Sequence, residues 1–318
     1  MRFVIIFLIF LNLYAFDFVD IYRFKGEDAL NKKIEALLAS PNFWKNRIKD
    51  YNVTLGYFQN QKDILVCIKD KKILNVYKYN KNFNLLDSIE VLTGLDGDKM
   101  KEGDLKTPIG VYKLVNLLTK VNSFYGPFAF ETEYPNLYDR AQKKNGYGIW
   151  IHGFPLKGKR DDNTKGCIVM KNNNLKHLKK EINYKNSYLL IAQDKLLTTN
   201  IDEISKILAF IYKWRKAWME SDLETYKTFY DKSFRKSDGK NLKEFLEYKK
   251  RVFKIRANQK VEIFFNDINI IPYQNINNEK IFRIDMQQKY FAKNYKYIGP
   301  KELYIKFVNN KIKIIIEK

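Results

Sequence analysis

The hydrophobic pattern of this 318-residue chain changes its period near Ala192. From about residue 54 to residue 190, short apolar runs with two-residue alternation follow one another, separated by turn residues such as Asn80-Lys81-Asn82. This period is typical of strands. The predicted strands cover 64–68, 73–79, 88–93, 110–115, 148–152, 167–170 and 188–192. Together they predict a mainly-β domain over residues 53–196, folded as an antiparallel barrel or sandwich.

Beyond residue 192 the apolar residues recur at steps of three and four, which predicts helices. The first is expected over 202–220, and the second begins at a capping box of Ser221 and Glu224 and runs to Tyr230. A third helix over 242–252 precedes strands over 261–270, 280–290 and 302–316, the last bent by a turn at Asn309-Asn310. Helices followed by long antiparallel strands predict a separate α+β domain over residues 200–318.

The order of Trp214, Trp218, Asp222 and Tyr226 in this second domain resembles the cone-shaped nuclear-transport-factor-like superfamily. The resemblance is one of topology. It implies a pocket between the helices and the sheet, with room for a glycan or a peptide. Because a fold alone does not confer a function, the ligand of this domain is left open.

The first sixteen residues read as a targeting segment. Arg2 is followed by an uncharged apolar stretch that reaches the small residue Ala15. This pattern predicts a secretory signal peptide over residues 1–16, because the stretch is shorter than the ~20 apolar residues that span a bilayer. The alternative is an uncleaved membrane anchor.

Residues 17–52 are predicted to form a short helical segment. Its apolar face begins after Gly26 and stops at Ser40-Pro41. An amphipathic helix of this length must pack against something. We expect it either to cover the strand-rich domain or to form a homodimer.

The chain is strongly basic, since 58 Lys and Arg residues against 36 Asp and Glu give a formal charge of +22. The cations are scattered through every segment and no recognisable nucleic-acid motif accompanies them, so we expect no nucleic-acid partner. Solvated surface lysines explain most of the charge. The functional alternative is attraction to a polyanionic partner, which would act on encounter rate because salt screens charges over ~8 Å.

The chain contains only two histidines and two cysteines, and one of each lies in a single glycine-marked stretch. Alternation with Ile149 and Ile151 places Trp150 and His152 on the same face of a strand. Cys167 follows fifteen residues after His152. A free thiol titrates near pH ~8.5, so a neighbouring imidazole is the natural group to convert it to a thiolate. The pair predicts thiol chemistry.

The stretch around this pair resembles the L,D-transpeptidase catalytic domain (YkuD type), whose motif is a His-Gly followed by Ser/Thr-x-Gly-Cys. The resemblance implies Cys167 as nucleophile, His152 as base and the carbonyl of Gly153 as the group that orients the imidazole. Amides near Gly166 and Cys167 would form an oxyanion hole, beside Thr164. It further implies peptidoglycan stem peptides as substrate, a periplasmic location and no cofactor.

Other segments carry the same resemblance over roughly residues 60–195. Thr93-Gly94 and the run from Gly103 to Tyr112 match two earlier motifs of the family in the correct order. The run from Tyr134 to Arg140 is similar to a branch of periplasmic members that hydrolyse. We expect Tyr134, Arg140 and Trp150 to contact substrate, with Arg140 holding a carboxylate.

One departure from the family pattern bears on the reaction. Cross-linking members usually carry an arginine two residues after the cysteine, where this chain has Val169. This difference favours an L,D-carboxypeptidase, which removes the terminal D-Ala of a tetrapeptide stem and thereby influences cell shape. The alternatives are an L,D-transpeptidase, a hydrolase that releases protein linked to diaminopimelate, and a non-catalytic wall-binding scaffold.

The remaining candidates have simpler interpretations. Cys67 lies in a continuous apolar strand and is expected in the core, not in a disulfide with Cys167, while His177 lies on a short polar helix and is expected to be exposed. No zinc-ligand spacing is recognisable, so we predict no metal. Residues 94–106 are expected to be a mobile loop, and residues 123–148 either a lid or an aromatic satellite core.

Overall fold

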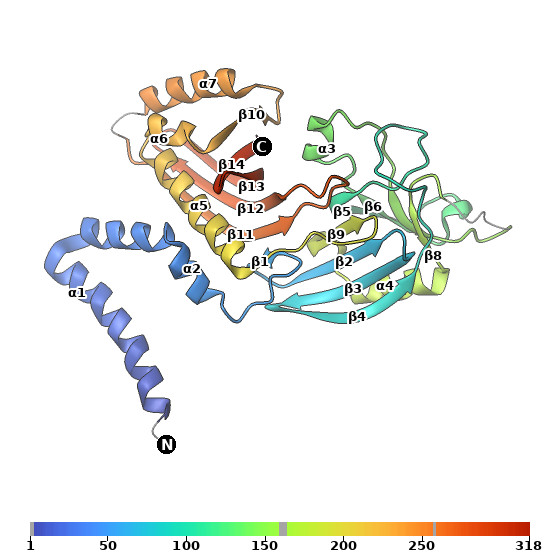
Figure 1. Cartoon of the computed structure of the whole chain (residues 1–318), viewed down its shortest axis with the longest axis horizontal. Helices are drawn as coiled ribbons and strands as arrows, with labels where there is room; N and C mark the ends of the chain where they lie inside the picture. The colour runs from blue at the N-terminus through green and yellow to red at the C-terminus, as the bar shows by residue number, and fades with distance from the viewer. Residues whose placement is uncertain (1–2, 159–163, 257–258) are drawn as a thin grey trace.

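The computed structural model of the chain describes residues 3–158, 164–256 and 259–318, with side chains from residue 17 onward (Figure 1). Residues 1 and 2 of the predicted signal peptide lie outside the described residues. Helices at the N-terminus are followed by two sheets, one of eight strands and one of six. The predicted multidomain architecture, a mainly-β domain and an α+β domain with a helical N-terminal segment, is confirmed.

The eight-stranded sheet forms the first domain, in the order β4-β3-β2-β9-β5-β6-β7-β8. Its strands are β2 (Lys62–Ile68), β3 (Ile73–Asn80), β4 (Asn82–Glu90), β5 (Gly110–Leu118), β6 (Ala129–Thr132), β7 (Trp150–Gly153), β8 (Ile168–Met170) and β9 (Ser187–Ala192). A bridge between Leu92 and Val169 joins the segment after β4 to β8 and nearly closes the sheet. The barrel-like class is as predicted, but the pairing is mixed, since β2 with β9 and β7 with β8 run parallel.

Strand β2 is buried along its whole length because both faces of the sheet are covered. Leu65 and Cys67 point into the core that Leu175 and Leu178 of α4 (Asn172–Glu181) help to fill. The other face, with Val66, joins a core shared with the second domain. The prediction for Cys67 is confirmed, and both cysteines are free thiols.

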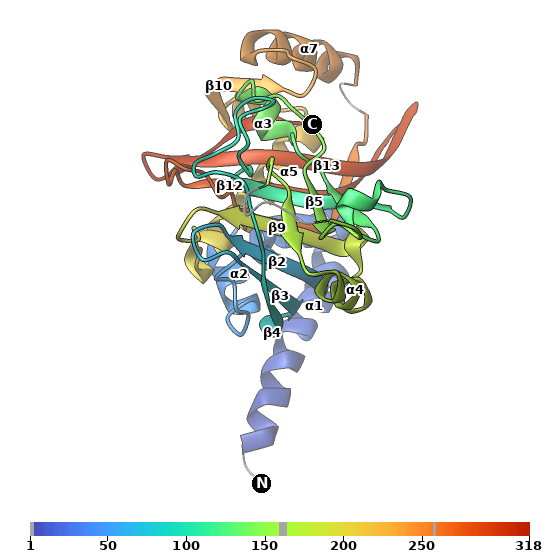
Figure 2. The ribbon, with the colours of Figure 1, turned by 90° about the vertical axis from the view of Figure 1, so that its right-hand side faces the viewer.

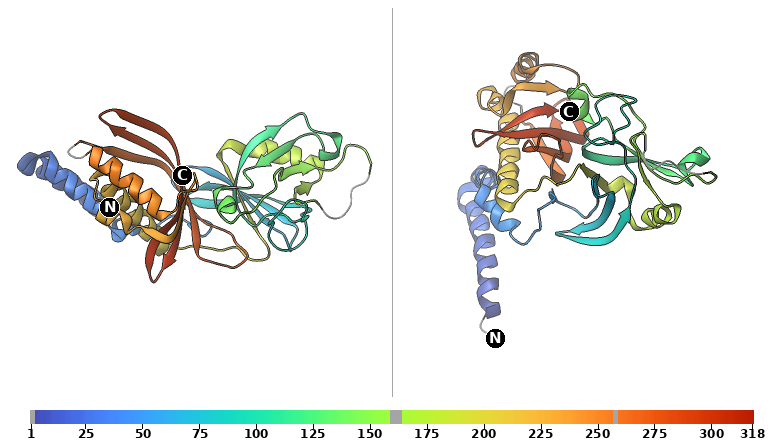
Figure 3. Two further views of the ribbon diagram at one scale, coloured as in Figure 1. Left: turned by 90° about the horizontal axis from the view of Figure 1, so that it is seen from above. Right: turned by 45° about the vertical axis from the view of Figure 1, so that its right-hand side comes forward.

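The second domain is built on the order β1-β11-β12-β13-β14-β10. Its strands are β1 (Tyr57–Phe58), β10 (Tyr230–Lys236), β11 (Glu262–Pro272), β12 (Ile281–Ala292), β13 (Tyr295–Val308) and β14 (Lys311–Glu317), covered by α5 (Ile201–Met219), α6 (Leu223–Lys227) and α7 (Leu242–Ile255). Strand β1 precedes the strands of the eight-stranded sheet in the chain, yet it pairs with β11 of the six-stranded sheet. The two domains are therefore joined side by side through sheet pairing and a common core (Figure 3).

Two local predictions in this domain are wrong. Asp222, not Ser221, caps α6, because its carboxylate accepts the Thr225 amide while Ser221 takes a left-handed conformation (φ 56°). The second error is the helix end: α6 ends at Lys227 instead of reaching Tyr230, and Tyr230 is the first residue of strand β10.

The strand predicted over 302–316 is a hairpin of β13 and β14. The chain reverses at Asn309 and Asn310, which have φ of 47° and 60°. Asparagine tolerates this left-handed pair, which matches the twist of the flanking strands.

The N-terminal helices lie on the second domain. Helix α1 (Phe3–Leu38) is interrupted at Gly26 (φ 77°) and leads to α2 (Pro41–Arg47), capped by Ser40. The Trp44 ring stacks on Tyr212 of α5 at 5.3 Å, so the expectation that this segment covers the strand-rich domain is wrong. The first turns of α1 project away from the body (Figure 2). No helix among the described residues is both long enough and apolar enough to cross a membrane.

Candidate active site

Cys167 and His152 line one pocket of about 620 Å³ in the first domain. Strand β7 supplies Trp150 and His152, and the turn before β8 supplies Cys167. The loop between β4 and β5 supplies another part of the lining. The described lining residues are Lys99, Glu102, Gly103, Leu105, Phe124, Tyr125, Gly146, Tyr147, Gly148, Ile149, Trp150, His152, Lys165 and Cys167.

The imidazole of His152 is held in one orientation. The side chain is 1% exposed, and Nδ1 lies 2.8 Å from the carbonyl oxygen of Gly153. A carbonyl oxygen can only accept a hydrogen bond, so this contact assigns the imidazole proton to Nδ1 and leaves the lone pair on Nε2. Tyr125 packs edge-on against His152 at 5.0 Å and against Trp150 at 4.9 Å, which fixes both rings.

Gly153 is needed at its position for a steric reason. A Cβ built there would lie 2.0 Å from Oδ1 of Asn172, the first residue of α4. The end of β7, where the Gly153 carbonyl oxygen orients His152, therefore packs directly on the N-terminus of α4. Any side chain at residue 153 would displace the acceptor that orients the imidazole.

A tight turn presents the thiol of Cys167. Thr164 Oγ1 donates to the Cys167 carbonyl oxygen at 2.7 Å and accepts the Gly166 amide at 3.0 Å. Gly166 has φ of 119°, and a Cβ there would lie 2.7 Å from the carbonyl oxygen of Lys106. Cys167 itself is partly exposed, with Sγ 3.6 Å from the carbonyl oxygen of Gly148.

These contacts correct two of the predicted roles. The Gly166 amide donates to Thr164, so it does not point at a substrate carbonyl. Thr164 is 4% exposed and uses its hydroxyl within the turn, so it is a turn-forming residue and not a substrate contact.

Tyr134 and Arg140 do not lie where a substrate contact was expected. Tyr134 is buried, with its hydroxyl 3.0 Å from the carbonyl oxygen of Asn145. Arg140 donates to the carbonyl oxygen of Pro135. Neither is among the described residues that line the pocket, whereas Trp150 is. The sequence motif placed both side chains at the site, but Tyr134 is buried in the core and the exposed Arg140 donates to a local carbonyl instead.

The segment 123–148 is divided between the two predicted roles. Phe128, Phe130 and Tyr138 are buried and belong to the core. Phe124 and Tyr125, in the short 3-10 turn Ser123–Tyr125, line the pocket. The satellite-core interpretation therefore holds for most of these rings, and the pocket takes the first two.

Buried lysines anchor the loop between β4 and β5. Lys69 Nζ donates to the carbonyl oxygens of Leu95 at 2.9 Å and Thr107 at 3.2 Å. Lys144 bonds Asp98 at 2.6 Å, and Lys99 bonds Asp104 at 2.7 Å. Burial lowers the pKa of Lys69. The sequence did not single out Lys69 and Lys144, because Leu95 and Asp98 lie 26 and 46 residues from them; Asp104 lies only five residues from Lys99.

A second pocket of about 580 Å³ lies in the second domain, between α7 and the sheet. Lys249 is held 4.2 Å from the Trp218 ring centroid, and Lys301 is paired with Glu317. Burial lowers the pKa of Lys249 to about 7. The pocket between helices and sheet agrees with the predicted cone.

His, Cys, Asp and Glu side chains of the described ranges form no group of three or more that could hold a metal ion. His177 is exposed on α4, as predicted, 3.8 Å from Asp87.

Two family models match the chain. The L,D-transpeptidase catalytic domain (YkuD) matches residues 61–188, and the Cds6 C-terminal NTF2-like domain matches residues 206–318. The helical cell shape determining protein Pgp2 of Campylobacter jejuni is 39% identical, with a TM-score of 0.82 over 88% of this chain and 99% of that one. Bd1075 of Bdellovibrio bacteriovorus is 26% identical, with a TM-score of 0.66 over 84% of this chain and 96% of that one.

A curated relative, the putative L,D-transpeptidase YafK of Escherichia coli K12, is 34% identical over 107 residues. This match covers 33% of the present chain and 40% of the relative, so the two share less than half of that protein's length. With the near-complete match to Pgp2, these findings define the class. The chain belongs to the L,D-transpeptidase catalytic-domain family and carries a C-terminal NTF2-like domain.

Proposed function

We propose that this protein is a peptidoglycan L,D-carboxypeptidase that removes the terminal D-Ala from tetrapeptide stems and leaves tripeptides. The observation that carries the proposal is the shared pocket of Cys167 and His152, with Nδ1 of His152 held 2.8 Å from the Gly153 carbonyl oxygen. That contact prepares Nε2 as the base a thiol needs. The family match to L,D-transpeptidases supports the substrate class.

In this mechanism the Cys167 sulfur attacks the carbonyl carbon of the bond between the L-centre of diaminopimelate and D-Ala. His152 Nε2 takes the thiol proton and returns it to the leaving amine, so D-Ala departs and a thioester remains. Water then attacks the thioester, with His152 accepting its proton. The thiol is regenerated when the tetrahedral intermediate collapses, and the tripeptide leaves as a carboxylic acid.

Hydrolysis is favoured over cross-linking by the surroundings of the thiol. Val169, at the place where cross-linking members usually carry an arginine, is buried and hydrogen-bonded through its backbone to Leu92. Lys165 lines the pocket and would supply positive charge for the free carboxylate of a terminal D-Ala, whereas the Lys99 ammonium is buried and paired with Asp104. An acceptor amine would have to enter without the usual arginine, whereas water needs no such site.

The experiment is incubation of purified tetrapeptide muropeptides with the wild-type protein and with Cys167→Ala, followed by mass spectrometry. We expect tripeptides and free D-Ala from the wild type alone. Persistence of tetrapeptides with both proteins rejects the proposal. Cross-linked dimers would identify a transpeptidase, and release of a diaminopimelate-linked protein would identify the other hydrolase.

The non-catalytic scaffold is tested in cells. Pgp2 is described as a helical cell shape determining protein, and we propose an influence on cell shape for this chain too. A deletion strain complemented with Cys167→Ala should keep its abnormal shape. Full restoration by this variant would instead support a wall-binding scaffold.

We also propose a cellular location, a domain organisation and an oligomeric state for the enzyme. Residues 1–16 would direct it to the periplasm, residues 53–196 would form the catalytic domain and residues 200–318 the NTF2-like domain. Residues 17–52 would form a homodimer contact. Sedimentation velocity of the protein with and without residues 17–38 tests the dimer, since loss of those residues should give a monomer.

A further inference from the structure

A hydroxyl from the NTF2-like domain is buried inside the first domain. Tyr273, directly after β11, is fully buried, and its hydroxyl donates to Asp139 Oδ1 at 3.3 Å. The same hydroxyl accepts from Asn136 Nδ2 at 2.9 Å. A Cβ at Gly110 would lie 2.7 Å from this oxygen, so this glycine of the family segment from Gly103 to Tyr112 makes room for it. The second domain thus reaches the motif segments of the first.

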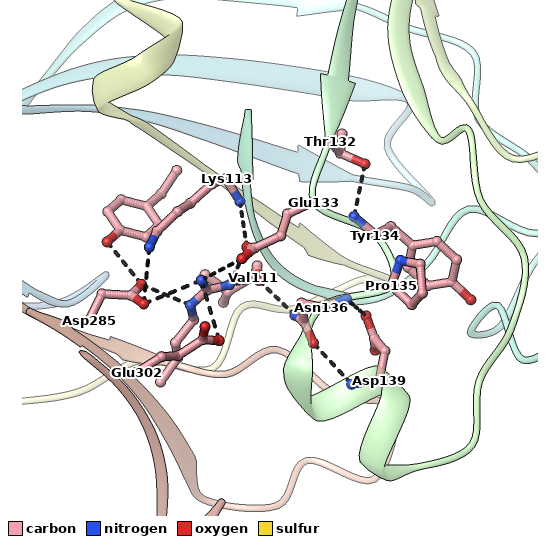
Figure 4. Close-up of polar contacts among 12 residues, drawn as sticks. Val111, Lys113, Thr132, Glu133, Tyr134, Pro135, Asn136, Asp139, Asp285 and Glu302 are labelled. Atoms are coloured by element: carbon pink, nitrogen blue, oxygen red, sulfur yellow. Dashed lines mark hydrogen bonds and ion pairs between the residues drawn. The ribbon is translucent and has the colours of Figure 1, made fainter. Parts of the chain in front are cut away.

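Asn136 and Asp139 form a closed unit at the start of α3 (Leu137–Ala141). The Asn136 side chain accepts the Asp139 amide at 2.9 Å, and the Asp139 carboxylate accepts the Asn136 amide at 3.1 Å (Figure 4). Asn136 Nδ2 also donates to the carbonyl oxygen of Val111 at 3.0 Å. Both side chains are 0% exposed, so every partner lost here would leave a buried polar group unsatisfied.

From Asp139 the contacts continue to the pocket wall. Lys144 Nζ bridges Asp139 Oδ1 at 3.0 Å and Asp98 Oδ2 at 2.6 Å, and Asp98 Oδ1 accepts the Ile109 amide at 2.8 Å. Burial opposes the charge on Lys144, but the two carboxylates outweigh it and raise the pKa of this lysine. Residue 98 is followed at once by Lys99, which lines the pocket.

Arg283 of β12 fastens the same region from a second direction. Its guanidinium is 0% exposed and donates to the Val111 carbonyl oxygen at 3.0 Å and to Glu133 at 2.7 Å. It also pairs with Asp285 at 2.8 Å within its own domain. Tyr273 and Arg283 of the NTF2-like domain therefore both hold the segment before α3. Figure 4 shows the side of this contact that contains Asp285 and Glu302.

We propose that Tyr273 is a positioning residue for the active site and that the NTF2-like domain sets the pocket wall over residues 98–105. The hydroxyl holds Asp139, Asp139 orients Lys144, and Lys144 holds Asp98 at the base of the wall. Since Lys99, Glu102, Gly103 and Leu105 line the same pocket as Cys167 and His152, the position of this wall governs how substrate is bound. The substrate part of this inference rests on the proposed carboxypeptidase function.

The test compares Tyr273→Phe with the matched variant Tyr304→Phe. Tyr304 is also fully buried at the domain contact, but its hydroxyl bonds Glu302 of its own strand at 2.9 Å. In Tyr273→Phe we expect hydrogen exchange of amides 98–105 to rise about tenfold, with exchange in β12 unchanged as the check on folding. Tyr304→Phe should leave exchange at 98–105 at the wild-type rate. Equal exchange at 98–105 in the two variants overturns the inference.

Kinetics on the tetrapeptide provide the second readout. We expect Tyr273→Phe to raise KM about three- to tenfold and to leave kcat within about twofold, because the wall binds substrate while the thiol and imidazole are untouched. Asp98→Asn, which weakens the last link from within the first domain, should do the same. A fall in kcat with unchanged KM in Tyr273→Phe contradicts positioning of the wall. If the wild type releases no D-Ala, the proposed function fails, while the exchange comparison still decides the positioning.

Discussion

The pocket around Cys167 and the pocket around Lys249 are similar in size, about 620 Å³ and about 580 Å³, but they are built differently. The first is formed by loops and strand ends whose backbone conformations depend on glycine, as at Gly166. The second lies between a regular helix and a regular sheet, and buried cations among aromatic rings give it its character. A tight turn presents the partly exposed thiol of Cys167 in the pocket that His152 also lines. Charge in the second pocket is tolerated because ion pairs and rings surround it.

The largest expected effect is the loss of activity when the thiol of the first pocket is removed. Cys167→Ala should lower D-Ala release at least ~10⁴-fold, since no other group in the pocket can form the thioester. The matched change Cys67→Ala should keep the activity and lower the free energy of unfolding by about 1–2 kcal/mol, because it removes a fully buried sulfur. Muropeptide turnover and urea unfolding measure both. Activity that survives in Cys167→Ala would place the chemistry elsewhere.

His152→Ala should reduce turnover ~10²- to 10⁴-fold through loss of the base. His177→Ala is the matched control, because that imidazole is 53% exposed on α4 and is not among the described residues that line the thiol pocket. Initial rates at saturating substrate, with the fold checked by circular dichroism, compare the two. Equal rates in the two variants would contradict the role of His152.

Gly166→Ala tests the dependence of the thiol pocket on backbone conformation. With φ of 119° and the Lys106 carbonyl oxygen 2.7 Å from the new Cβ, we expect destabilisation of about 3 kcal/mol or more and loss of turnover. Gly239→Ala in the second domain also has positive φ, 92°, but meets open space and should cost about 1 kcal/mol. Thermal unfolding and turnover distinguish them. Similar losses at both positions would show that the Lys106 contact adds nothing.

The smallest effect concerns the charge in the second pocket. Burial lowers the pKa of Lys249 from 10.5 to about 7, so the folded protein binds this proton less tightly than the unfolded chain. The resulting penalty is fully present below pH 7 and fades as pH rises toward 10.5. Lys249→Met should therefore stabilise the protein by about 1–4 kcal/mol at pH 6 and by less at pH 9.5.

Urea unfolding at these two pH values measures the effect of Lys249→Met. The exposed neighbour Lys250→Met should show no comparable pH dependence. A stabilisation that grows with pH would contradict the depressed pKa. D-Ala release should be unchanged in Lys249→Met, because that side chain lies in the other pocket.

Short-range patterns were sufficient for much of the fold. The three- and four-residue spacing placed α5 within a residue of its observed ends, Ile201 and Met219, and the apolar run placed β2. The His152 and Cys167 pair could be found because both residue types are scarce and the motif is local. Errors of one residue arose where two good capping residues adjoin, as at Ser221 and Asp222. Either side chain can cap a helix, so only the observed hydrogen bond decides.

What the sequence by itself determined is the period of each element, the existence of two domains and the thiol and imidazole pair, because these depend on neighbours a few residues apart. The tertiary structure alone decided that β1 pairs with β11, that Tyr134 is buried and that Tyr273 reaches Asp139. The partners in the last contact are 134 residues apart in the chain. Such contacts depend on burial and on close packing between domains, and no local pattern encodes either.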